Sequence, residues 1–466
     1  MNVNLIIFSF YLIGILIIAL IANRRCTSHE GFLIGDRSLN TFNAAISAGA
    51  ADMSAWMLLA LPGAVYIYGL NQIWIAIGLT IGACTNWSVI SHGLRRESTK
   101  VNAMTISDFL AKKVNDNGIT TRFICSLMIV IFFTIYIASG FTAGAKVLSD
   151  NFNFSYHSAL FTTFFIIATI ITIGGFLAVS YGEVFSGLII VCVIIIIPTL
   201  SFMKLDTMHK GIIDSVLSYN PNALNPFYNM SLVGIVSLLA WGLGYFGQPH
   251  ILAKFMAMKE GNNYRTSRNI AITWMFLGLF FAIIVGFLGS AIFSSNPLAD
   301  PELVLLEIAK YVLNPYFLAF IIIAVMASII DVANAQLLVV SSVFTNDLKI
   351  VKSTVTMNRI IIVIVGLVAV LLAWNPDRTI LSMVSYAWAG FGACFGPLII
   401  LCVKSSKPIQ KIPAITGIIV GGLTVILWNT ARAYLPEIEM FKLYELLPAF
   451  LLSFFSIYLL NFKKFG

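Results

Sequence analysis

The sequence predicts an all-α polytopic membrane protein with about thirteen transmembrane helices, and three observations support this fold class. Of 466 residues, 59% are hydrophobic and only 10% are charged, against roughly 25% charged residues in an ordinary soluble domain. Apolar runs of about 20 residues, the length that crosses ~30 Å of hydrocarbon, recur from Leu5 to Leu460. The basic residues alternate between loops as membrane insertion requires. A transmembrane barrel would show short strands of alternating polarity instead.

The apolar runs place the helices along the chain. We expect them to span residues 4–23, 42–68, 71–93, 122–145, 157–179, 183–203, 229–253, 269–293, 314–344, 357–374, 379–402, 412–431 and 443–461. No Lys or Arg precedes the first run and no small-residue cleavage site follows it. This run is therefore expected to be a retained anchor and not a signal peptide.

The loops differ in charge, which predicts the orientation of the chain. With thirteen spans, 21 of the 28 basic residues fall in one set of alternate loops, including Arg24, Arg25 and Arg37 in the first and six residues from Arg95 to Arg122 in the third. Because Lys and Arg concentrate in cytoplasmic loops, the N-terminus is expected outside and the C-terminus in the cytoplasm. The net charge of +8 follows from the same asymmetry, so no nucleic-acid partner is needed.

Several functional classes lack their usual residue patterns. The six cysteines and five histidines show no ligand spacing, so neither a disulfide framework nor a resident metal is expected. A membrane enzyme would need a nucleophile with a base, and a channel would need a continuous polar stripe or filter segments. The chain shows neither, and we expect no cofactor and no obligate protein partner.

Two carboxylates, Asp52 and Asp331, lie deep inside predicted spans. A carboxylate at mid-membrane costs at least ~2.5 kcal/mol, so each is a functional candidate. Asp52 follows a stretch of small residues, 44–51, which permits close helix approach and local unwinding. Unwound backbone at this depth is tolerated where it lines a cavity, and its free carbonyls can bind a cation. Glu183 is expected at the edge of its span, beside Tyr181 and Gly182, where water can reach it.

A second interruption lies in the seventh predicted span. Residues 241–249 contain three glycines and a proline, which predicts a broken helix. Counting 4–23 as an extra helix, Asp52 lies on the first helix of one five-span set, 42–203, and this break lies on the first helix of the next, 229–402. The two sets have opposite orientation, so we expect an inverted repeat with two further C-terminal helices, 412–461. Matching breaks in two halves are typical of the binding site of a secondary transporter.

The same segments resemble a known family, the sodium/solute symporters, and within it the sodium/proline symporters of bacteria. The run WGLGYFGQPHILAKFMA, Trp241 to Ala257, is similar almost letter for letter, with Lys254 where an Arg is usual. ADMSAW, Ala51 to Trp56, is similar with Ala55 in place of Gly. Further resemblance covers GDRSL around Arg37, LPGAVY from Leu61, FTIYxASG around Tyr136, GGFLAVS from Gly174 and QLLVxSS from Gln336. The resemblance implies a LeuT-like five-plus-five fold and alternating access.

The resemblance also implies residue roles. Ala50 and Met53 would offer backbone carbonyls to a sodium ion, and Asp52 would favour its binding. The pocket for a small substrate would be lined by Ser54, Ala55, Tyr136, Trp241, Tyr245 and Pro249. A zwitterionic amino acid suits such a pocket, because aromatic faces pack its apolar part and helix ends meet its charges.

The sequence departs from the family pattern in the ninth span. Alignment on QLLVxSS puts Asp331 and Val332 where the family has a Ser-Thr pair that binds sodium, with Ser328 as the preceding carbonyl ligand. A gap would instead align residues 326–328 with the family's Met-Ser-Thr. Asp331 then has two interpretations: it binds sodium as a carboxylate, or it carries a proton, because burial and a second carboxylate raise proton affinity. Glu183 also departs from the pattern, near the place of a family Asp.

Together these observations predict a secondary active symporter of the bacterial inner membrane. It would import a small amino acid, L-proline first, on a sodium gradient, with sodium as co-substrate. The alternative is a proton-coupled or mixed symporter of another small solute, because Asp331 and Val332 replace the family's sodium ligands.

Overall fold

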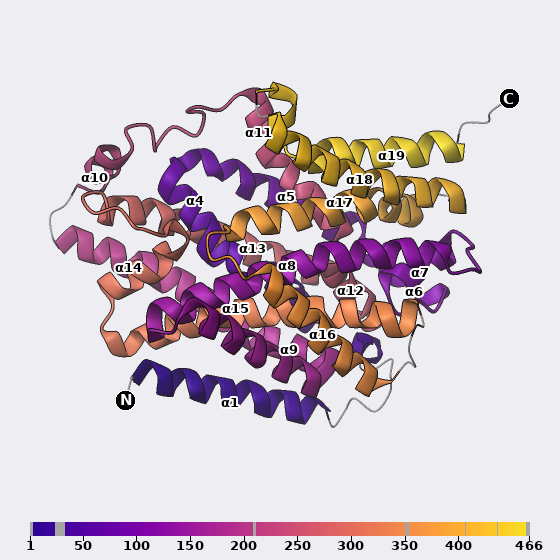
Figure 1. The fold of residues 1–466 in the computed structure, drawn as a ribbon, viewed down its shortest axis with the longest axis horizontal. Coiled ribbons are helices and arrows are strands. Elements are labelled where there is room, and N and C mark those ends of the chain that lie inside the picture. Colours follow the sequence, from indigo (N-terminus) through magenta and orange to yellow (C-terminus); the bar gives the residue numbers. More distant parts are fainter. Residues whose placement is uncertain are drawn as a thin grey trace.

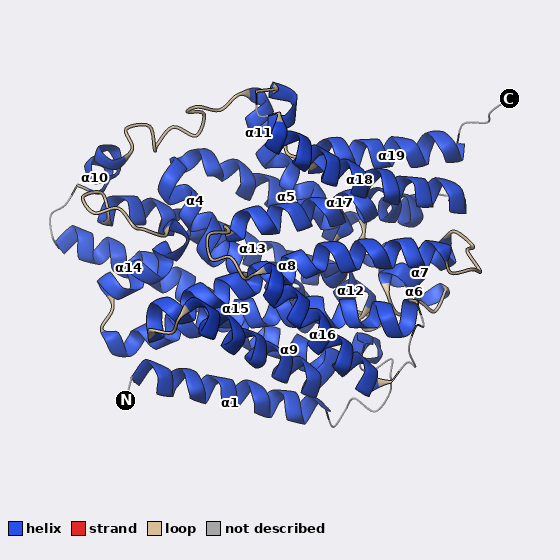
Figure 2. Cartoon of the chain, in the orientation of Figure 1, coloured by secondary structure: helices blue, strands red, loops and turns tan. Residues whose placement is uncertain are grey.

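The fold is a single bundle of helices. The computed structural model describes residues 3–23, 33–207, 211–348, 350, 354–405, 407–435 and 437–462, and these contain helices and one isolated bridge but no strand (Figure 2). The predicted all-α class is confirmed. Arg24 and Arg25, assigned above to a basic loop, lie outside the described residues.

The first half of the chain supplies one outer helix and the first broken span. Its helices are α1 (Val3–Asn23), α3 (Thr41–Asp52), the π-helical turn η2 (Trp56–Ala60), α4 (Leu61–Tyr68), α5 (Ile73–Val89), α6 (Ser91–Lys100), α7 (Ile106–Lys113), α8 (Thr120–Phe152) and α9 (Tyr156–Thr207). Short 3-10 turns, η1 (Gly35–Arg37) and η3 (Gly69–Gln72), precede α3 and α5. In Figure 1, α1 lies along one edge of the bundle, where it packs on α9 and α15.

The second half supplies the second broken span and the opposite edge. Its helices are α10 (Ile212–Tyr219), α11 (Leu232–Leu239), the 3-10 segment η4 (Ala240–Gly247), α12 (Pro249–Met256), α13 (Tyr264–Ile292), η5 (Pro301–Leu303), α14 (Val304–Val312), α15 (Pro315–Ser342), η6 (Val343–Asp347), α16 (Val355–Leu372), α17 (Ile380–Lys404), α18 (Lys411–Tyr434), η7 (Glu439–Lys442) and α19 (Leu446–Phe462). Helices α18 and α19 pack on each other and on α17 at the edge far from α1 (Figure 1).

The number of membrane-length helices is smaller than predicted. Among the described residues ten helices are long and apolar enough to cross a membrane, and the bent pair Leu232–Gly247 and Pro249–Met256 makes eleven. The difference from thirteen has two sources. The turns from Trp56 to Val89 make up one run in this count, although Gly69 (φ 80°, ψ −157°) leaves the helical conformation between α4 and α5, and the apolar part of α19, Leu446–Asn461, is short. The count of thirteen is therefore not confirmed.

The break between the fifth and sixth predicted spans lies earlier than expected. Gly175 interrupts α9 with φ 61° and ψ −161°, a conformation that glycine adopts without a steric penalty. The second apolar segment, Val179–Leu205, then begins before Glu183. This shift places Glu183 inside the helix, where its side chain is 0% exposed. The expectation that water reaches Glu183 at a span edge was wrong.

The two ends of the bundle differ in charge. We call the end that carries α6, α7 and the last turn of α12 the basic end, and the end that carries α10 and α14 the opposite end (Figure 1). Helix α1 begins at the opposite end and α19 ends at the basic end. At the basic end Leu39 forms a parallel bridge with Met258, and Arg37 donates to the carbonyls of Met256 (2.9 Å) and Ala103 (2.5 Å). The chain before α3 and the chain after α12 are thereby tied together.

A close backbone approach positions the second break. A Cβ atom built on Gly82 of α5 would overlap the backbone of Gly242 in η4, and one built on Gly242 would overlap Gly78. Only residues without a Cβ allow two backbones to pack at this distance. The glycines therefore let η4 lie directly against α5.

Candidate substrate and ion site

The first span breaks at the position where its sequence turns to small residues. Helix α3 ends at Asp52, and Met53 has φ −80° and ψ 73°, outside the helical region. The N–H of Ser54 donates to the carbonyl of Asp52 (2.9 Å), and the N–H of Met57 donates to Ser54 (3.1 Å). In a continuous helix these two N–H groups would bond to Ala50 and Met53. The break therefore diverts the usual donors from the two carbonyls that the family resemblance assigned to the ion.

The second span also breaks as its glycines and proline predicted. Gln248 is extended, with φ −77° and ψ 105°, and α12 starts again at Pro249, bent by 45° from the segment before it. The amide of Gln248 holds the gap by donating to the carbonyls of Gly244 and Trp388, each at 3.2 Å. Proline fits the first helical turn because its missing N–H would have no partner there. The first amides of α12 thus point into the gap.

The two breaks meet at Asp52. Its side chain is 1% exposed, and the hydroxyl of Tyr245 donates a hydrogen bond to Oδ2. The other oxygen, Oδ1, has no hydrogen-bond partner among the described residues, and no Lys or Arg there forms an ion pair with the carboxylate. An ionised carboxylate buried without a counter-charge is costly. Such a carboxylate can attract a cation.

Aromatic rings lie beside the first break and pack on the second. Trp56 donates its indole N–H to the carbonyl of Asp52 (2.9 Å), and its ring lies 6.4 Å from that of Trp241. Trp241 stacks on Tyr444 at 5.4 Å, and Tyr245 meets Trp388 edge to face at 5.0 Å. The indole N–H of Trp388 also donates to the carbonyl of Trp241 (2.8 Å). These rings form one continuous group, which we call the aromatic lid.

The predicted pocket residues gather in this region. Ser54, Ala55, Tyr136, Trp241, Tyr245 and Pro249 are all buried. The hydroxyl of Tyr136 lies near Ser54 and Asp52 but has no hydrogen-bond partner in the described part of the chain, and its ring lies 6.1 Å from His250. Ala55 starts the π-helical turn. An unpaired hydroxyl in an aromatic pocket is suited to a small amphipathic ligand.

Sequence reasoning missed Trp388 and Tyr444 as parts of this pocket. They come from α17 and from the segment before α19, neither of which the sequence marked as a broken span. Along the chain each is one aromatic residue among many, and only contacts with η4 mark them out.

The carboxylate that faces Asp331 is that of Glu183. Asp331 of α15 is 4% exposed, and the charged groups around it are Glu183 and Lys254, with the hydroxyl of Ser186 also close. A Cβ built on Gly182 would lie 3.8 Å from its Oδ1. Asp331 thus belongs to a polar cluster between α9, α12 and α15. Ser328, one turn earlier, is buried and uses its hydroxyl to bond the carbonyl of Val325 (2.7 Å).

Lys254 is the centre of this cluster. Its Nζ lies 2.6 Å from Oε2 of Glu183 and 3.1 Å from Oγ of Ser180, and it lies over the ring of Phe176. The predicted end of the seventh span at residue 253 would put Lys254 in the loop that follows, and this was wrong: α12 continues to Met256 and the Lys254 side chain is 1% exposed. With both carboxylates ionised, the single ammonium leaves one negative charge. The cluster can therefore take a proton or a further cation.

Comparison with known proteins agrees with this architecture. The model of the Sodium:solute symporter family matches residues 32–421. The sodium/proline symporter of Salmonella typhimurium is 37% identical over 470 residues, which cover 97% of this chain and 91% of that protein. The sodium/proline symporter of Staphylococcus aureus is 36% identical over 472 residues, covering 98% and 92%.

A solved structure shares the fold. The outward-open structure of a Na+-coupled sialic acid symporter superposes with a TM-score of 0.80 at 15% identity, covering 98% of this chain and 96% of that chain. The fold is thus the LeuT-like fold of membrane transporters, and the chain is an integral membrane protein. From the family match and the two near-full-length relatives, the chain belongs to the sodium:solute symporter family.

Proposed function

We propose that the protein imports L-proline, or another small amino acid, together with sodium by alternating access. The observation that carries this proposal is the Asp52 carboxylate, which is buried at a helix break without a cationic partner. Sodium would bind the carbonyls of Ala50 and Met53, whose helical donors are diverted, and neutralise Asp52. Relatives that match nearly the whole chain are named sodium/proline symporters, which supports the choice of ion and substrate.

The substrate would lie between the two breaks. The start of α12 presents free backbone amides and the positive end of its dipole, which suits a carboxylate. The rings of Trp241 and Tyr245 would pack against the apolar ring of proline. The methyl group of Ala55 narrows the pocket and would favour a compact amino acid. Binding would use contacts from both halves of the chain, so it can be coupled to their relative movement.

The orientation follows from charge. The loops of the basic end are rich in Lys and Arg, so this end would face the cytoplasm, the N-terminus would lie outside and the C-terminus inside. A bacterial inner membrane suits this arrangement. The aromatic lid of Trp56 and Trp241 would then close the outer side of the site.

A second candidate is a proton-coupled or mixed mechanism, and the cluster of Asp331, Glu183 and Lys254 favours it. The one ammonium pairs with Glu183, and the buried carboxylate of Asp331 lies near both groups, so one proton would complete the charge balance. Sodium at Asp331 is the competing assignment, with Ser328 supplying a carbonyl.

The test is uptake of labelled proline into proteoliposomes with a sodium gradient and a pH gradient imposed separately. Uptake driven by sodium at equal pH is expected. Uptake driven by the pH gradient alone would show that the coupling ion is the proton and not sodium. No proline uptake under either gradient would overturn the substrate assignment, and a screen of other small amino acids would follow.

A further inference from the structure

A cavity connects the second helix break with the basic end. Its volume is about 30 Å³, room for roughly one water molecule or one small ion. Pro249, His250 and Lys254 line its inner part, and Thr105, Ser107 and Asp347 line its outer part. Asp347 ends η6 at the basic end of α15. The cavity therefore joins the candidate substrate site to a carboxylate for which the proposed transport step has no use.

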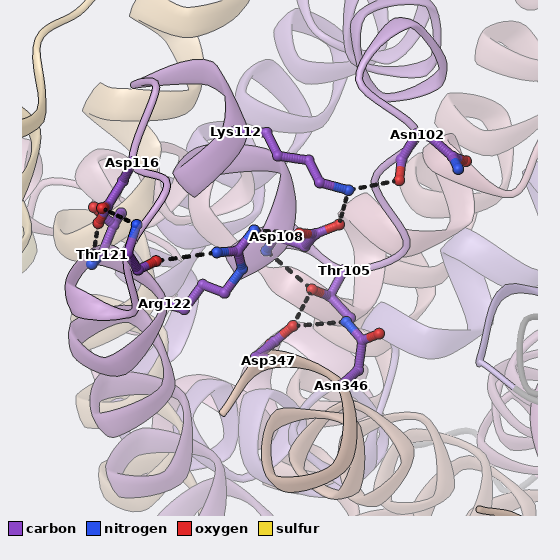
Figure 3. A network of polar contacts seen from close by, with 10 residues as sticks. Asn102, Thr105, Asp108, Lys112, Asp116, Thr121, Arg122, Asn346 and Asp347 are labelled. Carbon is purple, nitrogen blue, oxygen red and sulfur yellow. Dashed lines mark hydrogen bonds and ion pairs between the residues drawn. The ribbon is translucent and has the colours of Figure 1, made fainter. Parts of the chain in front are cut away.

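Asp347 is buried but only half satisfied. Its side chain is 2% exposed. Oδ1 accepts hydrogen bonds from Oγ1 of Thr105 (2.6 Å) and from the amide of Asn346 (2.9 Å), as Figure 3 shows. Oδ2 has no hydrogen-bond partner among the described residues, and neither does the buried hydroxyl of Ser107 on the same cavity wall. The Ser107 hydroxyl and the Asp347 carboxylate thus lie close together on the cavity wall.

The neighbouring carboxylates in the same network are neutralised. Asp108 pairs with Lys112 (2.7 Å) and Arg122 (2.9 Å) (Figure 3). Asp116 pairs with Lys411 (3.0 Å). In the described part of the chain, no basic side chain forms an ion pair with Asp347. Asp347 is therefore the carboxylate of this network whose negative charge is not balanced by a basic side chain of the described residues.

We propose that Asp347, with the hydroxyls of Ser107 and Thr105, forms a second and weaker site for a monovalent cation on the path from Asp52 to the cytoplasm. A carboxylate and hydroxyl oxygens suit a hard monovalent ion. A path with several weak sites lets an ion leave a deep site stepwise, since each site shortens the distance over which the ion is unsolvated. This inference rests on the proposed function for the direction of release, not for the existence of the site.

Two sources could supply the positive charge. One is the sodium ion, and the other is the charged amine of the substrate. The shared chemistry is a single positive charge against one carboxylate. Experiments with sodium alone and with proline alone, in choline buffer, distinguish them.

The transport test compares Asp347→Asn with Asp108→Asn in inside-out proteoliposomes. Asparagine keeps the oxygen that accepts from Thr105, so the hydrogen bond persists while the charge is lost. The half-saturating cytoplasmic sodium concentration for proline transport should rise about tenfold in Asp347→Asn, the loss of one charge-assisted contact. External sodium dependence, measured in right-side-out vesicles, should stay unchanged. Asp108→Asn removes the same charge from a paired site and should leave both values unchanged.

Ser107→Ala is a second variant that tests the same site if Asp347→Asn fails to fold. Apart from its approach to Asp347, the Ser107 hydroxyl has no hydrogen-bond partner among the described residues, so its removal breaks no other hydrogen bond there. It should also raise half-saturating cytoplasmic sodium, by less than Asp347→Asn. Equal sodium dependence of wild type, Asp347→Asn and Ser107→Ala, or an equal shift in Asp108→Asn, would overturn the site.

Binding of radioactive sodium separates this inference from the proposed function. Purified Asp52→Asn protein should retain weak sodium binding, and Asp52→Asn with Asp347→Asn should bind less. Retained binding at the same level in the double variant would reject the site at Asp347. Failure of sodium-driven proline uptake by the wild type would instead reject the proposed function. The sodium-binding comparison would still show whether Asp347 forms a cation site. Displacement by proline in choline buffer would assign the site to the substrate amine.

Discussion

The hydroxyl of Tyr245 donates a hydrogen bond to the carboxylate of Asp52 across the gap between the two broken helices. The two residues are 193 positions apart in the chain and belong to different halves of the bundle. This contact makes the candidate ion site sensitive to the relative position of α3 and η4. A cation bound to Asp52 would compete with the hydroxyl of Tyr245 for the carboxylate and weaken their hydrogen bond. Ion binding could in this way be coupled to movement of η4 relative to α3.

Asp52→Asn should reduce sodium-driven uptake to background while the protein still inserts into the membrane. The amide retains the shape of the side chain but loses the charge that attracts the cation. Uptake in proteoliposomes, with the amount of inserted protein measured on the same vesicles, checks this. Asp377→Asn makes the same chemical change at an exposed position and should transport normally. Normal driven uptake by Asp52→Asn would refute the central role of this carboxylate.

Tyr245→Phe should lower the stability of the sodium-free protein. A hydrogen bond to a charged group contributes about 1.5–3 kcal/mol, and Asp52 would lose the donor to its Oδ2. Saturating sodium should reduce the difference from wild type, because the cation supplies the missing positive charge. Thermal unfolding in detergent with and without sodium measures both effects. An equal loss in both conditions would separate Tyr245 from ion binding, and Tyr316→Phe, at an exposed position, is the control.

The buried pair of Lys254 and Glu183 should show strong coupling in a double-mutant cycle. Lys254→Met leaves two carboxylates without their ammonium, and breaking a buried pair costs about 3–5 kcal/mol. Adding Glu183→Gln removes one of these charges, so the double variant should be more stable than the sum of the single effects predicts. The exposed pair of Lys442 and Glu439 should show no measurable coupling. Additive effects at Lys254 and Glu183 would argue against a functional ion pair.

The ion pairs of Glu97 should make the basic end sensitive to acid. Hydrogen bonding by Lys100, with a further contribution from Lys113 of α7, lowers the pKa of Glu97 to about 2. Because an unfolded Glu titrates near ~4.3, this contribution is fully present above that pH and is lost as the pH falls toward about 2. Glu97→Gln should therefore lower the unfolding temperature relative to wild type near neutral pH.

That difference should shrink as the pH falls through the same window. Thermal unfolding of both proteins over the acid range measures it, and Glu260→Gln, an exposed glutamate, should show no such trend. A constant difference between wild type and Glu97→Gln at every pH would show that packing, not charge, explains the effect.

Local patterns in the sequence accounted for most of the elements. Apolar runs predicted the helices, and the small residues before Asp52 and the glycines before Pro249 predicted both breaks. These are short-range effects, because backbone freedom at Gly and the missing N–H of Pro act within one turn of the chain. The break at Gly175 in α9, earlier than the predicted division between residues 179 and 183, shows the limit: hydropathy alone does not say where a helix bends.

The sequence by itself determined the membrane class, the two interrupted helices and the carboxylate placed in one of them. Only the tertiary structure decided which groups meet: Tyr245 with Asp52, Glu183 with Lys254 and not with water, and Asp347 with no basic partner in the described part of the chain. The physical reason is the distance along the chain over which each interaction acts. Hydropathy and backbone propensity act between neighbours in sequence, whereas the charge balance of a buried group depends on side chains that packing brings from distant helices.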